Sequence, residues 1–237
     1  LFDSIFNSNN NTTNTNNNTN GSIDQNPGTQ IQKLHQISYR PVAGYGLFTK
    51  GVERLVSENL VQGKPKTTTD YVPVVRYTDQ ETGIVYEQDS KHTELRLTNT
   101  TIPNTYEALF SPDGVHIIFR FLDTDQQTIL TYIASLAPKT TAPTDLTGYF
   151  TYQNIKNIQI STDGNSFVYT RPKPVGVDVV TTLFNNKKDT VLFSSPISEW
   201  VVDSINKSTI LTTKPTGLFD GYSYTIENTT LAYSKTL

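Results

Sequence analysis

The chain contains no cysteine and no methionine among its 237 residues. Without cysteine it has no disulfide bonds, no thiolate metal ligands and no cysteine nucleophile. Charged residues are also scarce at 17% of the chain, and 19 lysines and arginines nearly balance 22 aspartates and glutamates. The formal net charge of −3 provides no field that would attract nucleic acid or an anionic membrane. The composition therefore argues against a polyanionic partner.

Long apolar runs are missing as well. No run approaches the roughly 18 apolar residues of a membrane-spanning helix, and no charged segment is followed by an apolar one as in a signal peptide. The first residue is Leu1, whereas translation starts with methionine, so we expect the chain to be a processed or trimmed piece. Any signal or anchor segment would then lie upstream of it.

The beginning of the chain has an unusual composition. Residues 7–20 consist only of Asn, Thr and Ser. Such a tract cannot bury enough apolar surface to offset the entropy lost on ordering. We therefore interpret residues 1–30 as an Asn/Thr-rich linker or tether. A stack of Asn side chains that a partner orders is the alternative.

From about residue 31 the chain is rich in β-forming residues. Short runs of Val, Ile, Thr, Tyr and Phe alternate with Asp, Asn, Gly and Pro, a pattern typical of strands and turns. The pattern predicts three hairpins with turns at 79–83, 123–126 and 185–188. Only Val52–Val61 has apolar residues at helical spacing, so we expect a short helix or a long loop there, followed by a loop at 62–69.

The sequence repeats itself with a period of about 50 residues. The segment Phe110-Ser111-Pro112-Asp113-Gly114, followed by Ile118-Phe119, returns as Ile160-Ser161-Thr162-Asp163-Gly164, followed by Val168-Tyr169. A degenerate third copy begins at Trp200 and has lost the Asp-Gly pair. Each copy predicts a strand, a tight turn and a second strand, because Asp and Gly suit a turn that needs positive φ and a local hydrogen bond. About four strands per period is typical of a propeller blade.

The segment from Ser111 to Gly114 resembles the Ser-Pro-Asp-Gly turn of the TolB-type, WD40-like β-propeller repeat, which is common in bacterial periplasmic and surface proteins. The second copy has Thr where the repeat has Pro. The resemblance implies an all-β fold, a β-propeller of four-stranded antiparallel blades at about residues 40–100, 101–152, 153–195 and 196–237. It implies a structural role in the blade turns for seven residues: Ser111, Pro112, Asp113, Gly114, Ser161, Asp163 and Gly164.

The number of blades bears on how the propeller would close. Four blades are few, and nothing follows the last hairpin that would complete a blade from the other end. We therefore expect these blades to belong to a larger ring, with a closed ring of four as the alternative.

Residues that could carry catalysis or bind a metal are scattered. The three histidines, His35, His92 and His116, have no second ligand at metal-binding spacing. The acidic pairs Asp79/Glu81 and Asp123/Asp125 lack the EF-hand pattern, so we interpret them as hairpin turns. The segment 221–225 lacks the second Gly of a nucleophile elbow. We predict no metal, no cofactor and no catalytic residue.

Trp200 and four arginines are interpreted as structural. Trp200 occupies an inner-strand position and is expected in the core rather than against a ligand. The arginines that recur on expected strands are Arg76, Arg96, Arg120 and Arg171. We expect them to pair across blades or to face water, with an anion-binding rim as the alternative.

These features favour a non-catalytic extracytoplasmic β-propeller that serves as an interaction or structural module of a bacterial envelope or surface assembly. Its partner would be another protein or a second copy of the chain, and it would meet a membrane only through an upstream anchor. One alternative is the gating propeller of a larger hydrolase or peptidase. Another is a sugar-binding propeller with aromatics such as Tyr45, Tyr149 and Trp200 around a rim.

Overall fold

The computed structural model describes residues 36–61, 64–136, 142–205, 208–213, 222–227 and 230–236. The chain divides into two compact units, Leu1–Tyr39 and Arg40–Leu237, and every described strand belongs to the second. The expected tether at residues 1–30 lies outside the described residues.

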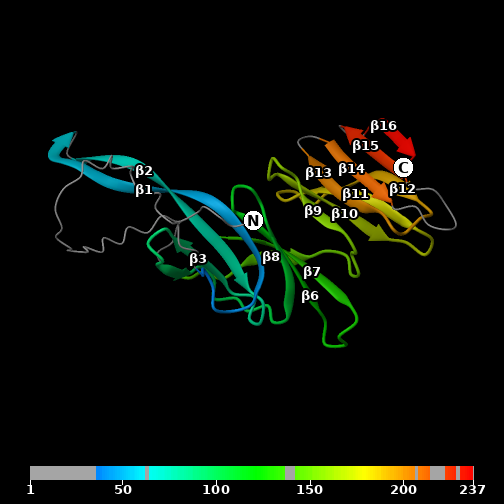
Figure 1. Cartoon of the computed structure of the whole chain (residues 1–237), viewed down its shortest axis with the longest axis horizontal. Helices are drawn as coiled ribbons and strands as arrows, with labels where there is room; N and C mark the ends of the chain where they lie inside the picture. The colour runs from blue at the N-terminus through cyan, green and yellow to red at the C-terminus, as the bar shows by residue number, and fades with distance from the viewer. Residues whose placement is uncertain are drawn as a thin grey trace, which may run out of the picture. The chain divides into compact units, whose positions relative to one another are not determined.

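The described residues of the second unit form four sheets of four antiparallel strands each (Figure 1). The first sheet contains β1 (Val42–Val61), β2 (Lys64–Asp79), β3 (Val85–Asp89) and β4 (Glu94–Arg96). The second contains β5 (Thr105–Phe110), β6 (His116–Leu122), β7 (Ile129–Ser135) and β8 (Thr147–Phe150). The third contains β9 (Ile158–Ile160), β10 (Ser166–Pro172), β11 (Val177–Leu183) and β12 (Asp189–Ser195). The fourth contains β13 (Val201–Ile205), β14 (Ser208–Thr213), β15 (Tyr222–Glu227) and β16 (Thr230–Thr236).

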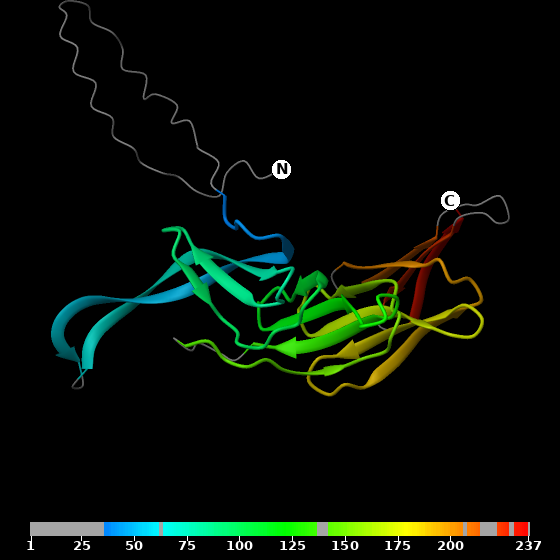
Figure 2. The ribbon, with the colours of Figure 1, turned by 90° about the horizontal axis from the view of Figure 1, so that it is seen from below.

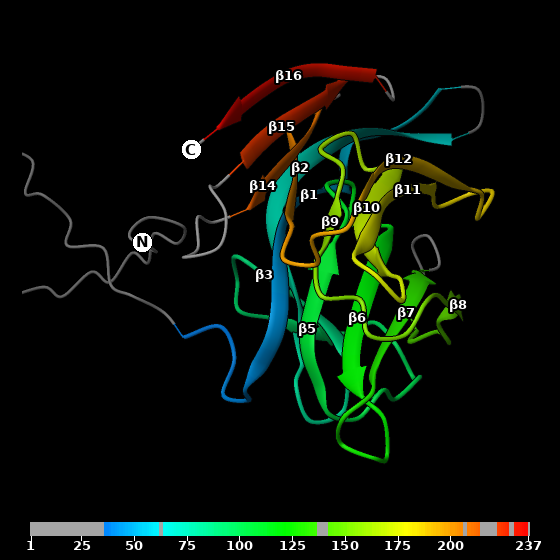
Figure 3. The same cartoon turned by 90° about the vertical axis from the view of Figure 1, so that its right-hand side faces the viewer.

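In every sheet the strands lie side by side in chain order, as Figure 3 shows for β5 to β8. An antiparallel four-stranded meander is the topology of a propeller blade. The predicted all-β fold with four-stranded antiparallel blades is therefore confirmed. No helix among the described residues is long and apolar enough to cross a membrane.

The three predicted hairpins are also confirmed, but the expectation for Val52–Val61 was wrong. That segment is the end of β1, and residues 64–69, expected as a loop, begin β2. The physical reason lies in the pairing of the two strands. The ladder is regular from Val52 to Leu55, so these two apolar residues lie on opposite faces, and register shifts follow Leu55 and Ser57. The apolar residues therefore fall three and four apart without sharing one face of a helix.

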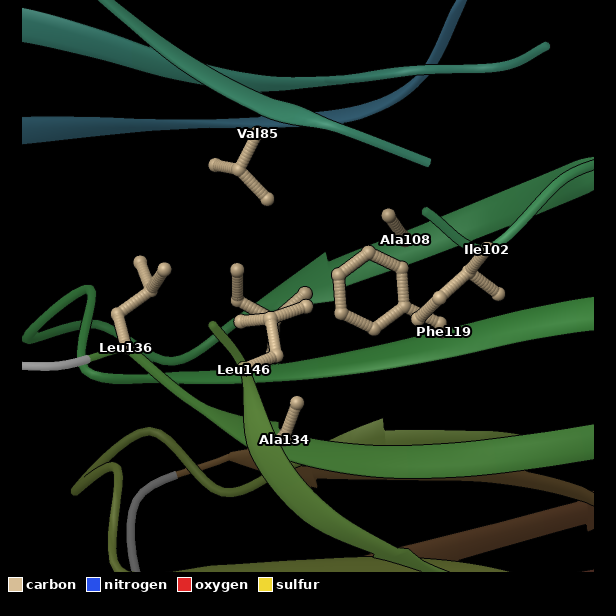
Figure 4. Packing of buried hydrophobic residues seen from close by; sticks show 8 residues of the cluster. Val85, Ile102, Ala108, Phe119, Ala134, Leu136 and Leu146 are labelled. Carbon is tan, nitrogen blue, oxygen red and sulfur yellow. The ribbon is translucent and has the colours of Figure 1, made fainter. Parts of the chain in front are cut away.

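Apolar side chains pack between neighbouring sheets. Ile117 and Phe119 of β6 belong to a cluster with Val85 of β3 and Ala108 of β5, which Figure 4 shows around the Phe119 ring. Ile118, between them in sequence, belongs to a second cluster with residues of the third sheet such as Phe167. Because alternate residues point to opposite faces, β6 is buried on both sides and carries a continuous apolar run.

Trp200 is buried in a third cluster, with Val168 and Val179 of the third sheet and Val202 of β13. The Phe193 ring meets it edge-on at a centroid distance of 5.5 Å. Its predicted place in the core is confirmed, and this burial leaves it unable to stack on a ligand at a rim.

Arg120 joins the second sheet to the start of the third. Only 7% of this β6 residue is exposed. Its Nη1 pairs with the carboxylate of Glu107 on β5. Its Nη2 donates to the carbonyl oxygens of Ile155 at 2.5 Å and Lys156 at 3.1 Å, just before β9. A buried guanidinium thus satisfies two carbonyls of the next segment, and the predicted pairing across blades is confirmed for this arginine.

We expect Arg120→Ala to lower the free energy of unfolding by about 3 kcal/mol, because it leaves a carboxylate and two carbonyls without their donor. Urea unfolding followed by the fluorescence of Trp200, the only tryptophan, measures the loss. Arg54→Ala is the matched control, since the Arg54–Asp70 pair is exposed and its loss should cost less than about 1 kcal/mol. Equal losses for the two variants would contradict the role of Arg120.

Candidate functional site: a polar hollow beside the blade turns

The turn between β5 and β6 is closed by a Ser–Asp hydrogen bond. The Ser111 hydroxyl donates to Asp113 Oδ1 at 2.5 Å and accepts from the His116 backbone N–H at 2.8 Å. Asp113 Oδ1 also accepts from the Val115 N–H, and the Gly114 N–H donates to the Ser111 carbonyl at 2.8 Å. Two side chains therefore satisfy the backbone of the turn and fix where β5 and β6 meet.

The turn between β9 and β10 repeats this arrangement one sheet further on. The Ser161 hydroxyl donates to Asp163 Oδ1 at 2.5 Å and accepts from the Ser166 N–H at 3.1 Å. The Asn165 N–H donates to Asp163 at 3.0 Å. The two copies of the sequence repeat thus form turns with the same hydrogen-bond pattern. In the third copy, β13 runs to Ile205 and the turn at 206–207 lies outside the described residues.

Conformation favours glycine at both Gly114 and Gly164, whereas space is short only at Gly114. Their φ values of +70° and +74° lie in the left-handed region that favours glycine. A Cβ on Gly114 would lie 2.5 Å from Arg76 Nη1, and one on Gly164 would lie 3.4 Å from Pro112 Cδ. The second turn therefore packs on the first, and the first turn packs on Arg76 of β2. In this way the turns link three successive sheets.

Beside these turns lies a hollow of about 500 Å³ between the first two sheets. One wall is made by β1 and β2 together with residues of β3 and the end of β4, and the other comprises residues that precede or follow strands of the second sheet. The lining residues are Thr49, Lys50, Gly51, Thr69, Tyr71, Arg76, Glu87, Leu95, Leu97, Asp113, Leu136 and Thr144.

The charges in this hollow are paired around Glu87 of β3. Only 5% of its side chain is exposed. Lys50 Nζ donates to Glu87 Oε1 at 2.5 Å and Arg76 Nε donates to Glu87 Oε2 at 2.9 Å. Arg76 Nη1 also donates to the Gly114 carbonyl at 2.7 Å. Two cations on one buried carboxylate leave a net positive charge, which Asp113 at the edge of the hollow balances.

Sequence reasoning singled out Arg76 and Asp113 but missed Lys50 and Glu87. Arg76 bridges the first sheet to the Gly114 turn, so the predicted pairing across blades is confirmed for this residue too. Lys50 was missed because it lies just before Val52–Val61, the segment expected to be a short helix or a long loop rather than a strand. Glu87 offered a usable signal. It lies two residues after the apolar Val85 and therefore shares its face of the strand, where a buried carboxylate needs a cationic partner.

The remaining chemical candidates serve structural roles. His116 Nδ1 lies 2.9 Å from Ser135 Oγ, its ring stacks on Phe184 at 4.3 Å, and burial lowers the pKa of its imidazole. Asp125 accepts the N–H groups of Gln127 and Thr128, so its predicted role as a hairpin turn is confirmed. The described residues contain no group of three or more His, Asp or Glu arranged to hold a metal ion.

Two other predicted features are placed only in part. His92 is exposed in a turn, whereas His35 lies outside the described residues. Of the segment 221–225, Gly221 lies outside the described residues and Tyr222–Thr225 belongs to β15 rather than to a strand-to-helix elbow.

The other two predicted arginines bond within their own part of the chain. Arg96 donates to the Thr98 carbonyl, and Arg171 pairs with Asp178 and Asp189 of its own sheet.

Neither a protein family model nor a curated protein sequence matches this chain. Solved structures that are similar to it include TolB from Acinetobacter baumannii, with 18% identity over 73% of this chain and 46% of that chain, at a TM-score of 0.47. The β-propeller domain of the Trilobed protease from Pyrococcus furiosus has 14% identity over 70% and 53% of the two chains, at 0.48. The acylaminoacyl peptidase from Pyrococcus horikoshii has 10% identity over 70% and 30%, at 0.46. This chain thus spans about half or less of each of these proteins.

We expect Gly114→Ala to destabilise the protein more than Gly164→Ala. Both variants force alanine into the left-handed region at a cost of about 1 kcal/mol. Gly114→Ala also displaces Arg76 from the Gly114 carbonyl, which should cost about 1 kcal/mol more. Urea unfolding at neutral pH measures both losses, and a larger loss for Gly164→Ala would contradict the packing of Arg76 on the turn.

The Asp163 turn predicts a pH dependence of stability. The Ser161 hydroxyl and the Asn165 N–H hold the pKa of Asp163 below its usual 3.8. A lowered folded-state pKa contributes stability above the unfolded-state pKa, and that stability is lost as the pH falls through the folded-state value. We expect the stability difference between wild type and Asp163→Asn to be constant from pH 7 to 5 and to shrink between pH 4 and 2. Parallel stability curves over that lower range would contradict this.

Proposed function

We propose that the chain is a non-catalytic, extracytoplasmic propeller module that binds another protein through an extended hairpin of its first blade. One observation carries this proposal. The β1–β2 ladder runs from Val42↔Asp79 to Val61↔Lys64, whereas β3 pairs only with Val74–Thr78 (Figure 2). Residues 49–61 and 64–73, here named the arm, therefore extend beyond the rest of their sheet.

The arm and its base expose large apolar side chains along one face. The cross-strand pairs Leu47↔Val75, Gly51↔Tyr71 and Leu55↔Thr67 lie on this face, separated by the pairs Thr49↔Pro73 and Glu53↔Thr69. Leu47 is 55%, Leu55 56% and Tyr71 74% exposed, whereas Val75 is buried. A two-stranded ribbon without a third strand is marginally stable in water, and large exposed apolar side chains on one face of it suit a protein-binding surface. A partner protein that covers this face would remove the three side chains from water.

The arm also forms part of the polar hollow. Thr49, Lys50, Gly51, Thr69 and Tyr71 belong to the arm and line the hollow. A partner on the arm would therefore contact the exposed apolar side chains of that face and, next to them, the ion-paired group around Glu87. Aromatic anchors beside charged and polar groups are the usual composition of a protein interface.

The proposed location rests on composition. The chain lacks cysteine and methionine, and residues 7–20 form an uncharged tract of Asn, Thr and Ser suited to a tether. A surface without methionine resists oxidation outside the cell. Surface proteolysis of intact cells tests this location, since an extracytoplasmic chain is cleaved without lysis.

We expect a photo-crosslinking amino acid at Tyr71, introduced in the native source, to form an adduct with one discrete partner protein. The same group at Val175, which is 70% exposed in the turn between β10 and β11, is the matched control and should form no such adduct. Mass spectrometry identifies the adducts. Equal adducts from both positions, or none from Tyr71, would contradict binding by the arm.

The alternative is a propeller that gates a larger hydrolase. A fluorophosphonate probe that labels serine nucleophiles separates the two functions. Under our proposal the native polypeptide that contains this chain remains unlabelled. Labelling of that polypeptide, at a residue outside this sequence, would favour the gating role.

A further inference from the structure

A second hollow, of about 370 Å³, lies between the second and third sheets and away from the arm. Its residues come from the end of β8 and the segment after it, and from β11, β12 and the turn that joins them. They are Tyr149, Phe150, Thr151, Tyr152, Thr182, Lys187 and Asp189. The volume is near the lower end of the roughly 300–1,000 Å³ of small-ligand sites.

Two tyrosines give this hollow aromatic surface. The Tyr152 side chain is 46% exposed and stacks on Tyr169 at a centroid distance of 6.2 Å. Tyr149 packs against the core cluster of the third sheet, and the Lys187 ammonium lies 4.4 Å from the centre of its ring. The Tyr149 hydroxyl is buried without a hydrogen-bond partner among the described residues. The hollow therefore presents the exposed ring of Tyr152, whereas Tyr149 forms its partly buried floor beneath Lys187.

The charges around the hollow balance and are already engaged. Asp189 accepts hydrogen bonds from Thr182 at 2.6 Å, from the Tyr169 hydroxyl at 3.1 Å and from Arg171 at 3.5 Å. Among the lining residues, a cationic ligand would meet Lys187 and an anionic ligand would meet Asp189. Neither sign is favoured, so the chemistry selects a neutral ligand.

We propose that this hollow binds a neutral saccharide ring. A sugar ring has an apolar face of C–H groups that can stack on Tyr152 and an edge of hydroxyls that can bond to Thr151 and Lys187. The site is made by one pair of neighbouring sheets, so it is a single site rather than a rim of equivalent aromatics. It is independent of the arm and of the protein partner proposed for it.

The test is a titration of the full chain with glucose, galactose and N-acetylglucosamine, followed by saturation-transfer and backbone NMR. We expect at least one of the three to bind with a Kd of about 1 mM, with shift changes at residues 149–152. Tyr152→Ala should weaken binding about tenfold, whereas Tyr152→Phe, which keeps the ring, should not.

Tyr71→Ala is the matched control, because it removes an exposed tyrosine from the arm and should leave sugar binding unchanged. Backbone NMR spectra show in the same samples that each variant is folded. Failure of all three sugars to bind folded wild type below about 10 mM would overturn the proposal. Unchanged binding by Tyr152→Ala, or equal weakening by Tyr71→Ala, would overturn it as well.

Discussion

The hydrogen bond from a turn serine to an aspartate two residues later is the interaction on which the remaining architecture depends. In both turns it orients a carboxylate that caps the following N–H groups, and it fixes the register of the first two strands. The glycine that follows adopts the positive φ that the turn needs. Arg76 occupies the space beside Gly114, and Pro112 lies at ordinary contact distance from a Cβ placed on Gly164. One local motif therefore sets the strand register, and at Gly114 it also leaves room for a side chain of the neighbouring sheet.

Charged residues that are buried in this layout connect separate segments of the chain. Arg120 and Glu87 are each buried, and each bonds to partners from more than one segment. Their removal would leave uncompensated polar groups inside the protein, which is costly. Apolar packing holds the sheets together, while these charged residues fix which backbone carbonyls and turns come into contact.

The blades could be predicted from the sequence because their signals are local. A turn with Asp and Gly between two apolar runs requires only neighbouring residues to form, and the β-rich runs on either side of residues 123–126 indicated a hairpin. The arm was misread because two register shifts disrupt the alternation of β1. The two hollows could not be predicted either, since Lys50 and Glu87, or Tyr152 and Asp189, come together only when separate strands pack.

The central claim is that the arm of the first blade binds a partner protein rather than remaining exposed to solvent. Hydroxyl-radical footprinting of the protein in its native source, and again after purification, tests it most directly. Tyr39, which is 90% exposed, provides an internal reference of the same residue type. The account predicts that Tyr71 is protected in the native source relative to Tyr39 and that this protection is lost on purification. Equal reactivity of Tyr71 in both samples would contradict it.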